Sequence, residues 1–222
     1  MLDNLIAFLA PHPCSTCGDN NGPLCDNCKY DIVSEPYGFC VACAKKLMLS
    51  TGLCSDCQVP YQRAWCVASR RDGLQRLINT YKFSNAMAAH KPLAELLHEH
   101  LPELPTSTII VPVPTVSSHI RQRGYDHMLL IAKNLAKRRS LPIDTNLTRA
   151  TSTKQREADR MTRFAQAKEA FVCKNPLNPD NIYLLVDDVM TTGATMKYAA
   201  QALVDGGATQ VWIASISHQP LD

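Results

Sequence analysis

The segment covering residues 182–195 constrains the fold of this chain more than any other part of it. It opens with a near-continuous apolar run at residues 182–186, which is typical of a strand buried on both faces of a parallel sheet. Two carboxylates, Asp187 and Asp188, follow directly, and then a short loop of threonine and glycine. A helical apolar pattern comes next and ends at Gly206-Gly207. A buried strand, a loop and a helix in this order predict an α/β fold.

The polar part of this segment predicts a ligand. It places an acidic pair at the carboxyl end of a strand, beside a helix N-terminus that can hold a phosphate. Gly193 can adopt a positive φ, and three threonines add hydroxyl donors. The alternative is an ordinary turn whose aspartates cap the helix, but two carboxylates exceed what a cap needs. The Gly-Lys-Ser/Thr ending of a Walker loop is missing, which disfavours triphosphate hydrolysis. The predicted ligand is a phosphorylated sugar.

Eight of the ten cysteines form four Cys-x-x-Cys pairs. Each pair can present two thiolates to one ion, and two pairs complete a tetrahedral site, so the chain can hold one or two structural Zn²⁺ ions. We expect the pairs to combine in sequence order, although an interleaved arrangement stays open. Ala44 suits the turn after its pair less well than Gly18 does. Disulfides or redox chemistry are the alternatives. The predicted metal ligands are Cys14, Cys17, Cys25, Cys28, Cys40, Cys43, Cys54 and Cys57.

Length and composition predict two parts: a zinc-ribbon module at residues 1–66 and an α/β domain at residues 67–222. No apolar run approaches the roughly 20 residues that span a bilayer. The first residues lack the basic region of a secretory signal, so we expect a cytoplasmic protein. Residues 1–66 carry four basic and six acidic side chains, which is a poor footprint for nucleic acid.

Positive charge is concentrated in the α/β domain. Residues 119–171 contain twelve Lys or Arg against five Asp or Glu, a balance of +7. This basic segment either lines the site and holds pyrophosphate or forms a surface that attracts nucleic acid, and the two interpretations are compatible. Its Lys133, Lys137, Arg138 and Arg139 fit a solvated helix face better.

The segment from Leu184 to Thr195 resembles the phosphoribosyl-pyrophosphate signature of type I phosphoribosyltransferases. In that family the acidic pair holds the ribose 2′ and 3′ hydroxyls, and the loop wraps the 5′-phosphate. The resemblance gives the first role to Asp187 and Asp188, one of which is also a candidate base. It gives the second role to Val189, Met190, Thr191, Thr192, Gly193, Ala194 and Thr195.

Other motifs extend the resemblance to the ComF/GntX family, which joins a zinc ribbon to a phosphoribosyltransferase domain and is associated with natural competence. They are the cysteine pairs, Tyr-Lys-Phe (81–83), Val-Pro-Val-Pro (111–114), Arg-Gln-Arg-Gly-Tyr (121–125), and Arg149, Gln155, Arg160, Arg163 and Phe171. The family usually has Arg-Gly-Phe-Asn-Gln where this chain has Arg-Gly-Tyr-Asp-His at residues 123–127, and Asn where Gln166 stands.

The resemblance also implies a reaction in which pyrophosphate leaves the ribose. Mg²⁺ would bridge the pyrophosphate and the ribose hydroxyls. A mobile loop at residues 149–163 would close over the site, where Arg149, Arg160 and Arg163 could neutralise the leaving group. The residues implied to contact pyrophosphate are Pro114, Thr115, Val116, Ser117 and Ser118.

Two functional hypotheses follow from these residues. The first is a Mg²⁺-dependent phosphoribosyltransferase that transfers the sugar to an unknown base and acts in bacterial competence, in the use of imported DNA. The second is a non-catalytic adaptor or nucleotide-responsive regulator that keeps the pocket for a ligand or for single-stranded DNA and binds proteins of the DNA-uptake machinery. Turnover separates the two.

Overall fold

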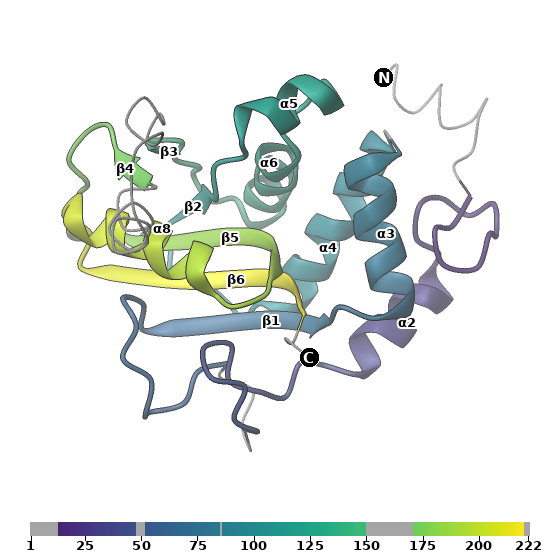
Figure 1. Ribbon diagram of the computed structural model, residues 1–222, viewed down its shortest axis with the longest axis horizontal. Coiled ribbons are helices and arrows are strands. Elements are labelled where there is room, and N and C mark those ends of the chain that lie inside the picture. Colours follow the sequence, from purple (N-terminus) through teal and green to yellow (C-terminus); the bar gives the residue numbers. More distant parts are fainter. Residues whose placement is uncertain (1–12, 48–51, 85, 150–170, 220–222) are drawn as a thin grey trace, which may run out of the picture.

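The computed structural model describes residues 13–47, 52–84, 86–149 and 171–219. Its centre is a four-stranded sheet in the order β1 (Arg63–Ser69), β6 (Gln210–His218), β5 (Ile182–Met190) and β2 (Thr108–Pro112), with all neighbours parallel (Figure 1). Strands β3 (Leu147–Arg149) and β4 (Phe171–Cys173) form a separate antiparallel pair. The fold class predicted from the sequence, a helix-flanked parallel sheet with a small amino-terminal cysteine module, is confirmed.

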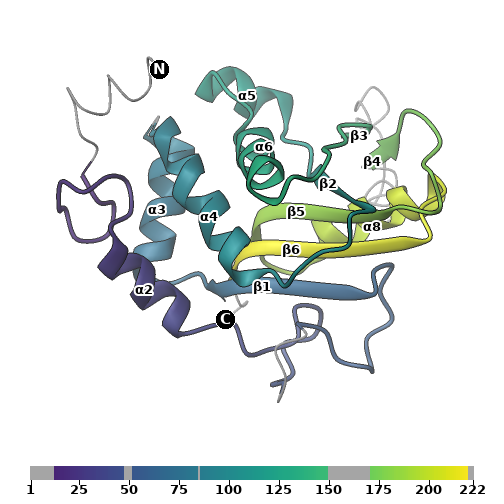
Figure 2. The same ribbon diagram turned by 180° about the vertical axis from the view of Figure 1, so that it is seen from behind.

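One face of the sheet is covered by three helices, α3 (Asp72–Phe83), α4 (His90–His100) and α6 (His127–Arg139), seen from behind in Figure 2. The short helices η1 (Met87–Ala89) and α5 (Ser117–Arg123) connect them to their neighbours. Leu184 and Val186 of β5 point into this core, where helix α3 buries Leu74, Leu77, Ile78 and Tyr81. That spacing of apolar residues is the one expected of a helix that packs along one side.

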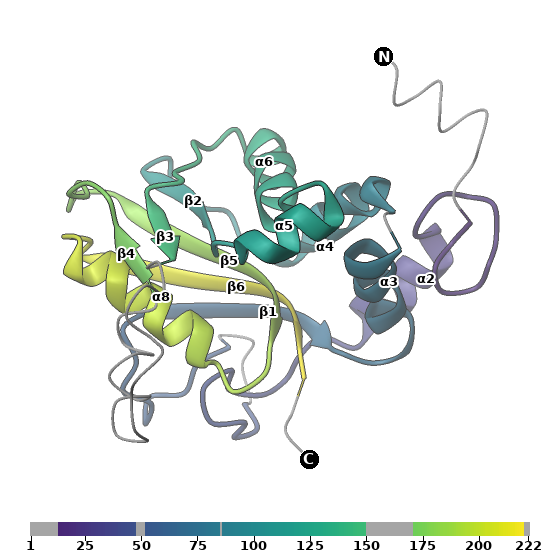
Figure 3. The ribbon, with the colours of Figure 1, turned by 45° about the horizontal axis from the view of Figure 1, so that its top comes forward.

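The other face of the sheet is covered by α8 (Ala194–Asp205), as Figure 3 shows. Tyr183 and Leu185 of β5 point to this side and share a core with α8 and with Val41 and Tyr61 of the cysteine module. Successive residues of a strand point to opposite faces, so β5 contributes to both cores. This alternation continues into the acidic pair.

The cysteine module lies along two sides of the sheet. Its helix α2 (Asp26–Ser34) packs near α3 and α4, where Lys29 forms ion pairs with Glu95 and Glu99. Its second half lies under β1 (Figure 1). Strand β1 spans the predicted boundary between residues 66 and 67, and that boundary stays a prediction. Among the helices of the described residues, none combines the length and the apolar character needed to cross a membrane.

Candidate functional site

The predicted phosphate loop, residues 189–195, covers the end of β5, the turn at residues 191–193 and the start of α8. Gly193 is the N-cap of α8 and has φ +72°, a left-handed conformation that suits glycine. Thr192 Oγ1 accepts a hydrogen bond of 3.3 Å from the amide of Ala194. A small cavity of about 20 Å³ lies beside the first turn of α8, whose amides have no partner within the helix. It is lined by Asp187, Val189, Met190, Thr191, Gly193, Ala194, Thr195 and Met196.

The two aspartates of the pair point to opposite faces of the sheet. Asp187 lines the loop cavity, and its Oδ1 accepts a 2.9 Å hydrogen bond from the amide of Asp188. Asp188 points toward the helices on the other face. There its Oδ2 lies 2.8 Å from Lys82 Nζ and 3.0 Å from His127 Nε2. All predicted loop residues lie together, but only one carboxyl of the pair faces the cavity.

The different surroundings of the pair shift the two carboxyl pKa values in opposite directions. Burial raises the pKa of Asp187 to about 7, and the nearby charge of Asp188 adds to the rise. Burial also opposes ionisation of Asp188. The hydrogen bond from His127 and the charge of Lys82 outweigh it, so the pKa of Asp188 lies well below its usual range. At neutral pH Asp188 is a buried anion, whereas Asp187 takes up and releases a proton.

Replacing Asp187 by Asn should flatten the pH dependence of stability. A carboxyl pKa that is higher in the folded state means that folding takes up a proton, so this group's contribution falls as pH rises from about 4 to about 7. The slope approaches about 1.4 kcal/mol per pH unit between the two values. Urea unfolding from pH 5 to 8 measures the free energy of unfolding of the wild type and of Asp187→Asn. Both proteins have the same zinc sites, so the pH dependence that comes from zinc cancels in the difference between the two free energies. If the free energy of unfolding changes equally with pH in both proteins, the raised pKa of Asp187 is wrong.

Lys82 and His127 are contacts of the site that the sequence did not predict. Tyr81 faces the core, and Lys82, next to it in the last turn of α3, reaches Asp188. His127 is the first residue of α6, whose N-cap Asp126 accepts a 3.1 Å hydrogen bond from the amide of Leu129. The hydroxyl of Tyr81 donates 2.8 Å to the carbonyl of His127 and joins the two helices. Both residues lie in or beside the Tyr-Lys-Phe and Arg-Gly-Tyr-Asp-His motifs, which give no role by themselves.

The predicted pyrophosphate loop lies next to the same network. Thr115 Oγ1 donates to Asp126 Oδ1 at 2.8 Å and lies 3.2 Å from His127 Nδ1. The exposed Val116 is the N-cap of α5, and the exposed Ser117 and Ser118 are the first residues of that helix. Arg149, at the end of β3, donates through Nε to the carbonyl of Pro114 at 2.8 Å. Arg149 is thus placed at this loop, whereas Arg160 and Arg163 lie outside the described residues.

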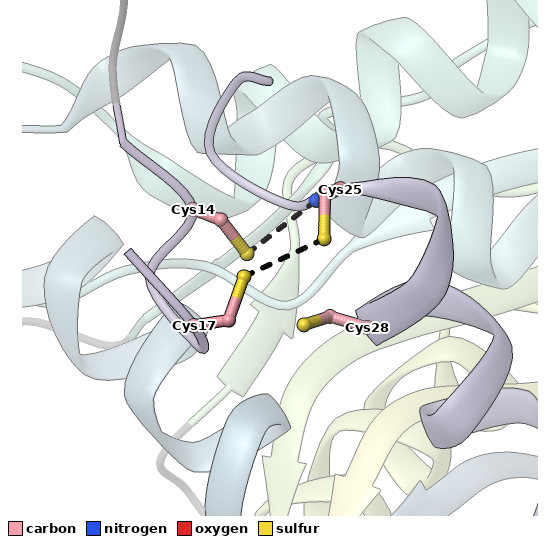
Figure 4. A group of neighbouring side chains, drawn as sticks. All are labelled: Cys14, Cys17, Cys25 and Cys28. Atoms are coloured by element: carbon pink, nitrogen blue, oxygen red, sulfur yellow. Dashed lines mark hydrogen bonds between the residues drawn. The ribbon is translucent and has the colours of Figure 1, made fainter. Parts of the chain in front are cut away.

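The eight paired cysteines form two groups, in the predicted sequence order. Within each group the sulfur atoms lie within 4.8 Å of one another. Figure 4 shows the first group, which consists of Cys14, Cys17, Cys25 and Cys28. The second consists of Cys40, Cys43, Cys54 and Cys57. Sulfur contacts of 3.4 to 3.7 Å are close to the roughly 3.8 Å that a tetrahedral Zn–S distance of about 2.3 Å requires, and all ten cysteines are free.

In both groups the same local geometry favours the thiolate of one cysteine. The amide of Cys25 donates to Cys14 Sγ and the amide of Cys54 donates to Cys40 Sγ, each at 3.4 Å. Burial alone raises these thiol pKa values, but backbone amides outweigh it and lower the pKa of Cys14 to about 6 and of Cys40 to about 7. Ala44 adopts the left-handed turn with φ 58°, so the alanine does not prevent the second group from forming.

The second cysteine group lies beside the phosphate loop. A cavity of about 370 Å³ separates them, with the module on one wall and the loop and α8 on the other. A Cβ placed on Gly193 would lie 3.7 Å from the carbonyl oxygen of Val41. The lining residues are Ala42, Cys57, Gln58, Val59, Tyr61, Thr192, Gly193, Ala194, Lys197 and Tyr198.

Two arginines of the basic segment, Arg138 and Arg139, form contacts within the protein. Arg138 forms an ion pair of 3.1 Å with Glu95. Arg139 donates to the carbonyls of Leu101 at 2.6 Å and Pro102 at 2.9 Å, near the end of α4. These two arginines tie α6 to α4 and are poor candidates for a nucleic-acid surface.

Comparison with known proteins gives relatives over most of the chain, although no family model matches. Competence protein F of Haemophilus influenzae is 31% identical over 209 residues, covering 85% of this chain and 88% of that protein. DNA utilization protein YhgH of Salmonella typhi is 28% identical over 217 residues (85% and 95%). Competence protein ComFC of Streptococcus pneumoniae is 26% identical over 200 residues (85% and 84%).

Solved structures resemble the chain more weakly. Glutamine phosphoribosylpyrophosphate amidotransferase of B. subtilis has a TM-score of 0.46 and 15% identity over 63% of this chain and 30% of that chain. Purine phosphoribosyltransferase of Pyrococcus horikoshii has a TM-score of 0.33 and 18% identity (63% and 83%). At TM-scores below 0.5 these similarities support no inference about ligand or activity.

Proposed function

The chain belongs to the competence protein F (ComF) family, and on that basis we propose that it binds phosphoribosyl pyrophosphate together with Mg²⁺ and acts in bacterial competence, in the use of imported DNA. One observation carries the ligand assignment. A buried carboxyl, a left-handed glycine turn and the free amides of a helix N-terminus line one cavity at the end of a central strand. These are the groups that a sugar bearing a phosphate needs.

Each group in this proposal has a distinct task. The amides at the start of α8 and the threonine hydroxyls hold the 5′-phosphate, and Asp187 accepts a hydrogen bond from a ribose hydroxyl. Arg149, fixed to the carbonyl of Pro114, lies where the loop at residues 114–118 would meet pyrophosphate. A guanidinium there stabilises the charge that develops on the leaving group. Mg²⁺ would be held by the oxygens of the ligand itself and would neutralise part of that charge.

We further propose that each cysteine group holds one structural Zn²⁺. Four thiolates close the tetrahedron and leave no open position for a water, so these ions have no catalytic role. Their task is to fold a module too small to be stable alone.

The alternative is a pocket that binds without turnover and serves an adaptor or regulator. The ion pairs of Asp188 favour it, because this carboxylate is held by Lys82 and His127 instead of facing the loop cavity. Transfer to a base would then lack one of the two ribose contacts that the family resemblance implies.

Binding and turnover can be tested with one loop variant. In Gly193→Ala the alanine must adopt a left-handed backbone conformation, which costs about 1 to 2 kcal/mol. We therefore expect the affinity for phosphoribosyl pyrophosphate with Mg²⁺ to fall about tenfold. Gly22→Ala is the matched control, since Gly22 also has a positive φ (+93°) but meets open space in the loop of the first cysteine group. Calorimetry measures binding, and pyrophosphate release with a panel of bases measures turnover. If the wild type does not bind phosphoribosyl pyrophosphate, the proposal is wrong. If it binds the ligand but releases no pyrophosphate with any base, the non-catalytic adaptor or regulator is the better description.

A further inference from the structure

The phosphate loop borders a second and larger cavity. Gly193 and Ala194 line both the cavity of about 20 Å³ that contains Asp187 and the cavity of about 370 Å³ beside the second cysteine group. Of these two, only the larger falls within the roughly 300 to 1,000 Å³ typical of pockets that hold small molecules. A ligand whose phosphate lies at Gly193 and Ala194 therefore has room to continue into the larger cavity.

Lys197 gives the larger cavity a positive charge. It lies one turn after Gly193 in α8, and its amide donates to the carbonyl of Gly193 at 2.9 Å. The residue is exposed and lines the cavity. Within the part of the chain that the structure describes, no ion pair or hydrogen bond holds its ammonium group. This ammonium group, which has three donors, is therefore free to bind an anionic group that enters the cavity.

The wall opposite α8 comes from the cysteine module. Gln58, Val59 and Tyr61 line it, and none of the described residues around the cavity is an aspartate or a glutamate. Cys57 lies on this wall as well, where a bound zinc ion would neutralise part of the charge of its thiolate. The cavity therefore combines a neutral, partly aromatic wall on the module with the cation of Lys197 on the side of the loop.

We propose that the site accepts ligands in which the 5′-phosphate of the sugar carries a second phosphate, and that Lys197 binds this second phosphate. The inference rests on the proposed function and widens its ligand class, since phosphoribosyl pyrophosphate carries a single phosphate at the 5′ position. The first phosphate lies at the loop, and the second lies beyond Gly193 in the larger cavity. Hydrogen bonds between an ammonium and a phosphate are charge-assisted and stronger than neutral ones.

Two nucleotides that differ by one phosphate test this inference. Cytidine 5′-diphosphate and cytidine 5′-monophosphate share the sugar and the base, so the ratio of their dissociation constants isolates the second phosphate. Calorimetric competition against phosphoribosyl pyrophosphate, at one fixed Mg²⁺ concentration, measures both constants. The wild type should bind the diphosphate about tenfold more tightly than the monophosphate, as expected for one charge-assisted hydrogen bond. In Lys197→Met this preference should be lost.

Two further variants keep this test decisive. Lys133→Met is the matched control, because Lys133 is an exposed lysine of α6 that lines neither cavity, and it should keep the preference. Gln58→Trp fills the larger cavity from the module and should weaken the diphosphate more than the monophosphate at wild-type zinc content. Equal affinities of the wild type for both nucleotides, or an unchanged preference in Lys197→Met, would overturn the inference even though phosphoribosyl pyrophosphate binds. If the wild type does not bind phosphoribosyl pyrophosphate, the proposed function itself fails.

Discussion

Variants that cannot hold metal at the second cysteine group should lose most of their affinity for phosphoribosyl ligands, whereas variants of the first group should keep it. Val41 and Tyr61 share a buried core with Met190, which belongs to the phosphate loop, and with Met196, which follows it. A module of this size depends on its metal to fold. Without the metal, the wall facing Gly193 disorders, and the loop loses the packing that holds its amides in place.

The comparison uses Cys54→Ser/Cys57→Ser for the second group and Cys17→Ser/Cys28→Ser for the first. Metal analysis should find two zinc ions in the wild type and one in each variant. Hydrogen exchange at residues 190–196 should accelerate only in the second-group variant, with a loss of affinity of more than about tenfold, or 1.4 kcal/mol. In the first-group variant the change should be confined to α2 and its neighbours. Equal effects of both variants on the loop would contradict this division, and disulfides without zinc would refute the ribbon assignment.

Replacing Lys82 by Met should destabilise the protein by about 3 kcal/mol or more at pH 7. The side chain of Asp188 is only 4% exposed, and breaking a buried ion pair leaves an uncompensated charge that costs about 3 to 5 kcal/mol. His127 remains as a partner, which places the expected loss at the lower end. Because the pKa of Asp188 is depressed in the folded wild type, its favourable contribution is complete above the unfolded pKa and is lost only as pH falls below that range.

The double variant Lys82→Met/Asp188→Asn gives the control for this prediction. It removes both charges, so it should recover part of the stability that Lys82→Met loses. Urea unfolding at pH 7 measures all members of the cycle. If the losses of the two single variants simply add, the pair is not coupled, and the description of Asp188 as an anion held by Lys82 is wrong.

The sequence predicted the features that depend on local pattern. The strand, glycine turn and helix of residues 182–205 and the order of the cysteine pairs are encoded over short distances, and the structure confirms both. Lys82 and His127 could not be found in this way, because they reach Asp188 from helices distant in sequence. Side chains alternate along β5, so Asp187 and Asp188 point to opposite faces of the sheet. The family resemblance, in contrast, gives both aspartates the same role at the ribose hydroxyls. Whether both still touch a ribose stays a prediction.

The strand order has a consequence for how the chain is made. In the described sheet β1 is an edge strand whose neighbour is β6, and Arg63 is paired with Trp212. A ribosome therefore releases β1 long before its partner exists, and the central sheet cannot close until β6 has been synthesised. Such a high contact order slows folding and leaves an unpaired strand exposed in the meantime. A chain that ended before β6 would keep both cysteine groups and the phosphate loop in its sequence, yet it would lack the strand that joins β1 to β5.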